Sequence, residues 1–237
     1  MNLFYQKGLL ETTKSVVFDK DESRHLQKVL RYKTGDKVSI TNGLGGLFTA
    51  TLVEVNQKQC VGTIIEYKKV PPLPYQLHMA VAPTKNNDRF EWFLEKTTEI
   101  GVAEITPIIC DHSERKVVKL DRFEKIIESA MKQSLKMYKP ILHPAISFSD
   151  FCKFQLNTRS KKYIAHCYHS EKKLLKDYCH PNESSIILIG PEGDFSTNEI
   201  EFSEKNGFIP ISFGESRLRT ETAAIVACST VYNINLT

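Results

Sequence analysis

Apolar and polar residues alternate in two different ways along the chain, before and after a proline-rich segment. Up to residue 70, apolar residues form brief strand-like runs at 15–18, 37–40, 47–55 and 60–67. The sequence VPPLP at 70–74 holds three prolines within five residues and interrupts any periodic element. We therefore predict two domains, one over residues 1–70 and one over residues 71–237.

The first predicted domain contains one helix among its strands, at residues 21–31. At about 100° per residue, three apolar residues share one side of this helix: Leu26, Val29 and Leu30. Three basic residues share the other side: Arg24, Lys28 and Arg31. Asn42-Gly43 and Gly45-Gly46 supply the turn of a hairpin between two strands. The pattern predicts a small β-barrel with one helix, whose basic side is either solvated or in contact with phosphates.

The second predicted domain alternates strands with helices. Its strand-like runs lie at 77–82, 104–109, 162–167, 185–190 and 208–214. Its helical runs lie at 88–101, 121–138, 196–207 and 220–232. This alternation predicts an α/β fold with a mostly parallel sheet covered on both faces. Ligands of such sheets bind beyond the carboxyl ends of the strands, and two turns there therefore become candidates for a binding site.

The first candidate turn is Gly190-Pro191-Glu192-Gly193, which follows four apolar residues. Its glycines permit close backbone approach, and Ser196 with Glu199 forms the S-x-x-E capping box of a following helix. The second turn is FGESRLRTETAA at 213–224, where Gly214 permits a turn and Thr220 is a candidate N-cap.

Neither turn carries a nucleotide-binding glycine fingerprint. Glu192 in the first turn and Asp194 directly after it would repel a bare phosphate, so a neutral or cationic ligand held by backbone groups fits better. The alternative is that both turns are only well-capped connections between strand and helix.

Charge is distributed unevenly between the predicted domains. Residues 1–70 hold 11 Lys and Arg against 7 Asp and Glu, whereas residues 71–237 hold 21 of each. The excess of +4 in the first domain indicates an anionic partner. No apolar run approaches the roughly 20 residues of a membrane helix, and the N-terminus lacks a signal-peptide pattern, so we expect a cytoplasmic protein.

The six cysteines are scattered and form no C-x-x-C pair, which favours reduced thiols over a disulfide framework. One group of histidines and cysteines could in principle gather around zinc: His166, Cys167, His169, Cys179 and His180. Its spacing fits no common structural zinc site, and we predict no metal.

Several segments, in one order along the whole chain, together resemble a known family. IGPEGDFSTNE at 189–199 and FGESRLRTETAA at 213–224 are similar to the paired signature of the ribosomal RNA small subunit methyltransferase E family. Four further segments match in the family's order: HLQKVLRYKTGD at 25–36, KNNDRFEWFLEKTTEIGVAEITPI at 85–108, SERK at 113–116 and AMKQSLKMYKP at 130–140. The chain departs from the family pattern at Asp194, where a second glycine is usual, and at Ser216.

The resemblance implies a fold, a cofactor and partners. These enzymes belong to the SPOUT class and methylate N3 of a uridine in 16S ribosomal RNA within the small ribosomal subunit. The resemblance implies S-adenosylmethionine as methyl donor, a trefoil-knotted domain that forms a homodimer, and a PUA-like N-terminal barrel that holds RNA. General rules of chain topology argue against knots, so the residues alone do not predict that feature.

The resemblance also implies which residues act. The donor would be bound by residues of the two turns and their neighbours: His166, Ile189, Gly190, Pro191, Glu192, Gly193, Phe213, Gly214, Leu218, Arg219 and Thr220. The catalytic candidates are Arg115 and Arg219, because positive groups near O2 or O4 stabilise the charge on a uridine that loses its N3 proton. Glu221 is the third candidate, which would orient an arginine or relay the proton. The RNA-binding candidates are Arg24, Lys28, Arg31, Lys85, Arg89 and Lys96.

Each of these roles has a structural alternative. Arg219 could merely pair with Glu221, and Arg115 could merely bind backbone phosphate. Lys85, Arg89 and Lys96 could simply be solvated at the surface. Two other functions also stay open: methylation of a ribose 2′-hydroxyl on the same scaffold, and a non-catalytic RNA-binding factor in ribosome assembly.

Overall fold

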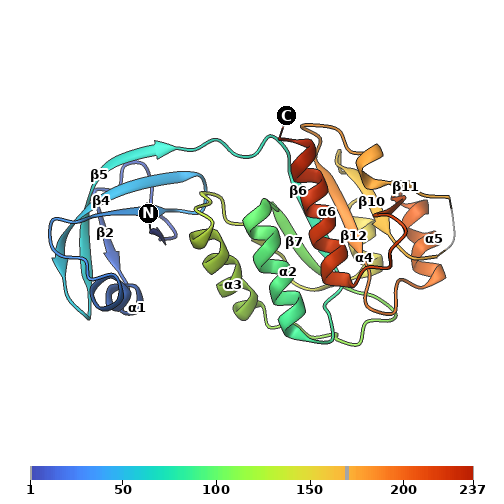
Figure 1. The fold of residues 1–237 in the computed structure, drawn as a ribbon, viewed down its shortest axis with the longest axis horizontal. Helices are drawn as coiled ribbons and strands as arrows, with labels where there is room; N and C mark the ends of the chain where they lie inside the picture. The colour runs from blue at the N-terminus through green and yellow to red at the C-terminus, as the bar shows by residue number, and fades with distance from the viewer. Residues whose placement is uncertain (1, 169–170, 237) are drawn as a thin grey trace. The chain divides into compact units, whose positions relative to one another are not determined.

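The computed structural model describes residues 2–168 and 171–236, and Figure 1 shows its helices and strands. The chain forms two compact units. Unit 1 consists of Met1–Pro72 together with Met131–Lys139, and unit 2 consists of Leu73–Ala130 together with Pro140–Thr237. Unit 1 thus includes a short segment from the middle of the chain, which the predicted division at residue 70 did not contain.

Unit 1 is built on a five-stranded sheet in the order β1-β3-β4-β5-β2. Its strands are β1 (Leu3–Tyr5), β2 (Ser15–Phe18), β3 (Lys37–Thr41), β4 (Gly46–Val55) and β5 (Cys60–Lys69). β1 is parallel to β3 and the other pairs are antiparallel, including the predicted hairpin of β3 and β4. Alternate strand residues fill a core that contains Phe4, Val16, Ile40, Phe48 and Leu52. The short β1 was not predicted.

The predicted helix at 21–31 has an irregular second half. α1 (Lys20–Arg24) is followed directly by a π-helical turn, η1 (His25–Val29), whose bonds include Leu30 N to His25 O at 3.0 Å. A π-helix turns through fewer degrees per residue than an α-helix, because its hydrogen bonds span five residues instead of four. Leu26 is consequently fully buried, while Val29 is 64% exposed, so the prediction that Val29 faces the core was wrong.

The segment 131–139 packs against the strands of unit 1. Gly45 N donates to Met137 O at 2.8 Å, and Lys139 N donates to Gly43 O at 2.9 Å. Gly45 has a φ of +88°, and a Cβ at this position would collide with the ring of Tyr138. Glycine is therefore required here by the approach of a distant segment as well as by the hairpin turn.

Unit 2 contains an eight-stranded sheet in the order β11-β13-β10-β12-β6-β7-β8, with β9 paired to β7. The strands are β6 (Leu77–Val81), β7 (Glu104–Ile109), β8 (Ile141–Leu142), β9 (Ile146–Ser147), β10 (Lys161–Ala165), β11 (Lys173–Leu174), β12 (Ser185–Ile189) and β13 (Ile209–Ser212). Every described pair is parallel, which confirms the predicted parallel sheet. The trefoil knot stays a prediction.

Helices cover both faces of this sheet (Figure 1). α2 (Asn87–Ile100), α3 (Leu120–Gln133) and α6 (Thr220–Ile234) contribute to one core, with strand residues such as Met79 and Ile187. α4 (Phe148–Phe154) and α5 (Thr197–Lys205) contribute to the other, with Ala80 and Leu188. Consecutive strand residues therefore point to opposite cores, as the two-residue period of a strand requires. A short 3₁₀ turn, η2 (Leu175–Asp177), precedes β12.

Two helix predictions need correction. α3 ends at Gln133 and not at residue 138, because Leu135 adopts a left-handed φ of 55° and the chain then enters the segment that packs in unit 1. α4 was not predicted at all. Among the described residues, no helix is long and apolar enough to span a membrane.

Candidate active site

The first candidate turn leaves the carboxyl end of β12, whose five residues are all buried. A Cβ on Gly190 would lie 3.1 Å from the buried ring of Phe195, so a side chain there would strain the turn. The predicted capping box is confirmed, since Glu199 N donates to Ser196 Oγ at 3.2 Å and Ser196 N donates to Glu199 Oε2 at 2.8 Å. The turn is thus fixed at both ends.

The carboxylates of Glu192 and Asp194 accept hydrogen bonds from backbone amides. Asp194 has a left-handed φ of 65°, a conformation that glycine adopts most easily and aspartate tolerates. Its carboxylate accepts from Cys167 N at 2.7 Å and from Phe195 N at 2.8 Å. Glu192 Oε1 accepts from Lys85 N at 3.0 Å. These carboxylates therefore tie the turn to two neighbouring loops, and Asp194 replaces the family's glycine with a side chain that performs this role.

The second candidate turn follows β13 and begins at Gly214, whose φ of +121° is unfavourable for other residues. Thr220 is not the N-cap of α6, as predicted, but its first residue; Arg219 holds the cap position without a side-chain bond. The hydroxyl of Thr220 instead donates to Gly190 O at 2.9 Å and is buried. This bond joins the two turns to each other.

The two turns and the loop after β10 enclose a cleft of about 700 Å³. All but one of the residues predicted to bind the donor line it: His166, Ile189, Gly190, Pro191, Glu192, Phe213, Gly214, Leu218, Arg219 and Thr220. The exception is Gly193, where a Cβ would lie 3.1 Å from His112. Sequence reasoning missed Cys167, Tyr168 and Lys172, which also line the cleft. The position of the first two after a parallel strand could have identified them.

The side of the cleft formed by the loop after β10 carries positive charge near an imidazole. Lys172 Nζ donates to His166 O at 2.7 Å and to Tyr168 O at 2.6 Å, and it lies 3.4 Å from His166 Nδ1. Burial lowers the pKa of His166, and Lys172 lowers it further. His166 Nε2 is buried without a hydrogen-bond partner among the described residues. Among the described residues, the imidazole of His166 therefore gives the cleft a polar atom without a hydrogen-bond partner.

The predicted catalytic residues occupy different positions. Arg219 is exposed and lines the cleft. Arg115 does not line it; Nη2 donates to Lys85 O at 2.7 Å and Nε donates to Thr84 O at 3.2 Å. Since Lys85 N donates to Glu192, Arg115 supports the first turn indirectly.

Glu221 is buried at the start of α6, and its ion pair is formed with Arg89, with 3.8 Å between Oε1 and Nε. Its other oxygen, Oε2, is buried without a partner among the described residues. The predicted alternative, a pair between Arg219 and Glu221, is not among the described ion pairs. Arg89, a predicted RNA contact, is thus directed towards α6.

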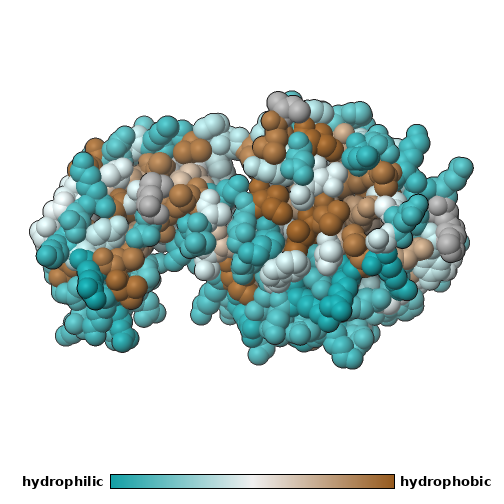
Figure 2. All heavy atoms as spheres, in the orientation of Figure 1, coloured by the Kyte–Doolittle hydropathy of each residue, from teal (hydrophilic) through white to brown (hydrophobic). Residues whose placement is uncertain are grey.

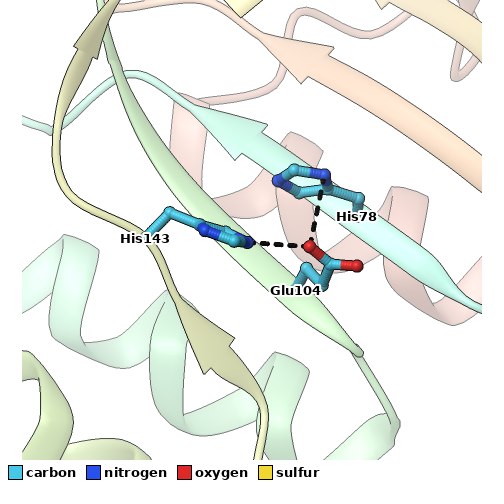
Figure 3. Close-up of side chains that lie close together, drawn as sticks. All are labelled: His78, Glu104 and His143. Carbon is cyan, nitrogen blue, oxygen red and sulfur yellow. Dashed lines mark hydrogen bonds and ion pairs between the residues drawn. The ribbon is translucent and has the colours of Figure 1, made fainter. Parts of the chain in front are cut away.

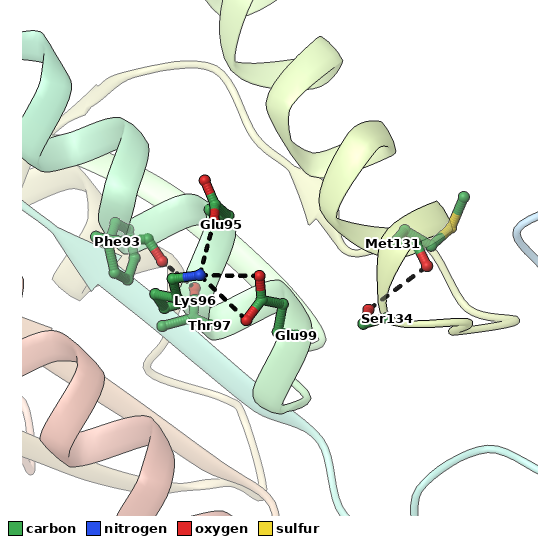
Figure 4. Close-up of polar contacts among 7 residues, drawn as sticks. All are labelled: Phe93, Glu95, Lys96, Thr97, Glu99, Met131 and Ser134. Carbon is green, nitrogen blue, oxygen red and sulfur yellow. Dashed lines mark hydrogen bonds and ion pairs between the residues drawn. The ribbon is translucent and has the colours of Figure 1, made fainter. Parts of the chain in front are cut away.

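The other predicted RNA contacts are exposed to different degrees. Lys96 Nζ is held between Glu95 at 2.7 Å and Glu99 at 3.0 Å (Figure 4). Lys85 Nζ lies 2.8 Å from Glu114, with most of its side chain in solvent. In unit 1, three predicted contacts are exposed: Arg24, Lys28 and Arg31. Acidic neighbours partly neutralise the candidates of unit 2, whereas no ion pair is described for the three in unit 1.

Comparison with known families defines the class of protein. Residues 71–232 match the model of an RNA methyltransferase domain, and residues 18–65 match that of an RNA methyltransferase PUA domain. The cleft thus lies within a methyltransferase domain, in a chain that also carries a PUA domain.

Individual relatives agree with this class. The ribosomal RNA small subunit methyltransferase E of Buchnera aphidicola is 33% identical over 221 residues, covering 89% of this chain and 85% of its own. The "probable rRNA-methyltransferase" of Porphyromonas gingivalis has a TM-score of 0.90 and 37% identity, covering 99% of this chain and 98% of its own. The Neisseria gonorrhoeae methyltransferase E, solved with S-adenosylmethionine, has a TM-score of 0.87 and 26% identity, covering 99% and 98%. The chain belongs to the ribosomal RNA small subunit methyltransferase E family.

Proposed function

We propose that this protein transfers a methyl group from S-adenosylmethionine to N3 of a uridine in 16S ribosomal RNA during maturation of the small subunit. The observation that carries the proposal is the cleft between the two turns, joined by the bond from Thr220 to Gly190, in a chain of this family. A structural relative of the same family holds S-adenosylmethionine.

The residues of the cleft fit this donor. Its volume of about 700 Å³ lies in the range for nucleoside-sized ligands. Four apolar side chains offer a surface for adenine: Ile189, Phe213, Leu218 and Ala223. The unsatisfied Nε2 of His166 offers a polar partner. The backbone of Gly190–Glu192 and of 214–219 supplies amides and carbonyls, which bind neutral and charged groups without a dedicated side chain.

When bound, the donor supplies an electrophilic methyl group on its sulfonium. The S–CH₃ bond breaks as the bond from carbon to uridine N3 forms, and the N3 proton leaves to solvent or to a neighbouring group. The attacking uridine carries negative charge shared by O2 and O4. We assign Arg219 to stabilise that charge, because it is the predicted catalytic residue that is both exposed and at the cleft.

Arg115 and Glu221 act as positioning residues in this proposal. Arg115 fixes the backbone of Thr84 and Lys85, which in turn holds Glu192 of the first turn. Glu221 fixes Arg89 at the start of α6, next to Thr220. Neither needs to touch the uridine for its loss to disturb the cleft.

RNA is held by both domains, with the PUA-like domain of residues 1–70 as the principal electrostatic contact and the methyltransferase domain of residues 71–237 as the weaker one. The exposed Arg24, Lys28 and Arg31 and the +4 charge of the first domain support this assignment. Lys85, Arg89 and Lys96 contribute less, because each has an acidic partner.

The protein acts as a homodimer in this proposal. Hydrophobic residues gather over the region of α6 on the face shown in Figure 2, and Ile225 and Val226 of this helix are only half-buried. Apolar helix surface of this kind is typical of homodimer interfaces. Light scattering on the purified chain should give twice the mass of 27.1 kDa.

The test is methyl transfer from labelled donor to small ribosomal subunits that lack the modification, followed by nucleoside analysis. The proposal predicts 3-methyluridine at a single position. A 2′-O-methylated nucleoside would instead support the ribose reaction, which requires no loss of the N3 proton. Binding of RNA without any transfer of label would support a non-catalytic assembly factor.

A further inference from the structure

A group of two imidazoles and one carboxylate lies at the amino end of the sheet in unit 2 (Figure 3). His78 is the second residue of β6, Glu104 is the first residue of β7, and His143 follows β8 directly. His78 and Glu104 are register partners, and His143 N donates to Ile105 O at 2.9 Å. Neighbouring parallel strands therefore bring these three residues to one level of the sheet.

The side chains converge on one carboxylate oxygen. Glu104 Oε2 lies 2.7 Å from His143 Nε2 and 3.9 Å from His78 Nδ1. The second distance is too long for a hydrogen bond, so the His78 ring faces the carboxylate without bonding to it. One ligand atom of each residue lies within 4.8 Å of the others. No lysine or arginine pairs with Glu104 in the part of the chain that the structure describes.

A contact of its second ring nitrogen fixes the orientation of the His78 ring. Nε2 lies 2.7 Å from Thr106 Oγ1, which orients the ring so that Nδ1 points to Glu104. A hydrogen bond to the other ring nitrogen commonly fixes the orientation of histidines that bind metals.

The three side chains border a cleft on one side. The side chains of His78, Glu104 and His143 are 13%, 30% and 38% exposed. They line a cleft of about 490 Å³ together with residues of β7, β9, α4 and β12. A metal held by these three residues would have a further coordination position directed to this cleft.

We propose that His78, Glu104 and His143 bind a divalent transition-metal ion of the Zn²⁺ class, with water or a small ligand in the remaining position. Two imidazoles and one carboxylate are a ligand set that zinc uses in open sites. Tetrahedral ligands at about 2.1 Å from zinc lie roughly 3.4 Å apart, so the side chains need to move by no more than about an ångström or two. The ion links β6, β7 and the segment after β8.

This site is separate from the methyl-donor cleft. All strands between them are parallel, and the donor cleft lies beyond their carboxyl ends, whereas this group lies at their amino ends. The predicted consequence is greater stability of the sheet edge, without a part in methyl transfer.

The first measurement is stoichiometric binding of zinc to the full chain after treatment with EDTA. Zinc alone is titrated in competition with a chromophoric chelator, and the proposal predicts one tight site per chain. Cobalt(II) is the second probe: its visible bands should indicate nitrogen and oxygen ligands, without the near-ultraviolet charge transfer from sulfur that a site at the exposed Cys167 would give.

The decisive variant is His143→Gln, because this side chain is the most exposed of the three and its loss disturbs packing least. Zinc affinity should fall by at least about 100-fold. The matched control His180→Gln removes another exposed histidine and should change affinity by less than about twofold. Glu104→Gln provides a second ligand variant should His143→Gln not fold.

Thermal unfolding separates ligand loss from misfolding. In EDTA, His143→Gln should melt at the wild-type temperature or close to it, and zinc should raise the melting temperature of wild type and His180→Gln only. Unchanged zinc affinity in both ligand variants, loss of binding in Cys167→Ser instead, or absence of a tight site in wild type would each overturn the proposal.

Discussion

The two ends of the parallel sheet in unit 2 carry sites that are built from different atoms. At the carboxyl end, the turns after β12 and β13 form a cleft where we propose that backbone groups bind the donor, and side chains such as Asp194 and Thr220 hold that backbone in place. At the amino end, His78, Glu104 and His143 direct their own nitrogen and oxygen atoms to one point.

This difference explains why the site at the carboxyl end is recognisable in the sequence, whereas the group at the amino end is not. A backbone site needs consecutive residues with particular conformations, such as Gly190 and Gly214, and these form a recognisable motif. A side-chain site needs only one residue from each of several strands. Residues 78, 104 and 143 have no characteristic spacing, because their proximity depends on the strand register.

The largest effect is expected from a variant at the carboxyl end of the sheet. Arg219→Ala should reduce the rate of methyl transfer by about 10²–10³, because it removes a positive group from the charge that develops on uridine. RNA affinity should change by less than about twofold, since one phosphate-sized contact at most is lost. Single-turnover kinetics and filter binding measure the two quantities.

Arg217→Ala in the same turn is the matched control for Arg219→Ala, and it should retain most of the rate. Equal losses of rate and RNA affinity in Arg219→Ala would contradict the catalytic assignment.

A smaller effect is expected where the two turns meet. Thr220→Val keeps the shape of the side chain but removes the hydrogen bond to Gly190 O, and leaves that buried carbonyl without this donor. Donor affinity should fall about tenfold, which corresponds to about 1.4 kcal/mol. Calorimetric titration of S-adenosylmethionine measures it, with Thr222→Val on the same helix as control. An unchanged affinity would show that the turns hold their places without this bond.

Donor affinity should also depend on pH through His166. Burial and then Lys172 lower the pKa of this residue below 6.5, while Asp194 opposes them, so the ring is neutral at pH 7. Protonation would place a second cation beside Lys172 in a cleft for a sulfonium. Affinity should thus be constant above pH 6.5 and fall as the pH drops below it. His166→Asn should remove this dependence, and an equal decline in the variant would assign it to other groups.

The smallest effect is expected when a variant at one end of the sheet is tested for binding of the ligand at the other end. Five residues of β12, about 15 Å, separate the two ends of the sheet, and the sites share no residue. His143→Gln should therefore leave donor affinity within about twofold, and Thr220→Val should do the same for zinc affinity. Changes of tenfold or more in both directions would indicate that the two sites are coupled.

The elements of the fold were largely predictable where local pattern and tertiary packing agree. β12 reads as an apolar run because both faces are buried, and α5 is marked by the capping box of Ser196 and Glu199. α4 was missed because seven residues are too few for a periodic pattern to be recognised.

Failures of prediction arose where packing overrides the local pattern. Val29 is exposed because a π-helical turn changes the angle between residues, which no propensity rule indicates. Thr220 reads as an N-cap, yet its hydroxyl bonds to a carbonyl 30 residues away in the chain. The exposure of Val29 follows from local helix geometry, whereas the bond of Thr220 depends on a contact that is distant in sequence.

Calorimetric titration of S-adenosylmethionine into the metal-free full chain tests the central claim most directly. The account predicts one donor bound per chain, with an affinity that Thr220→Val weakens and His143→Gln does not change. An absence of binding heat at several temperatures, with and without small ribosomal subunits, would contradict the assignment of the donor to the two turns.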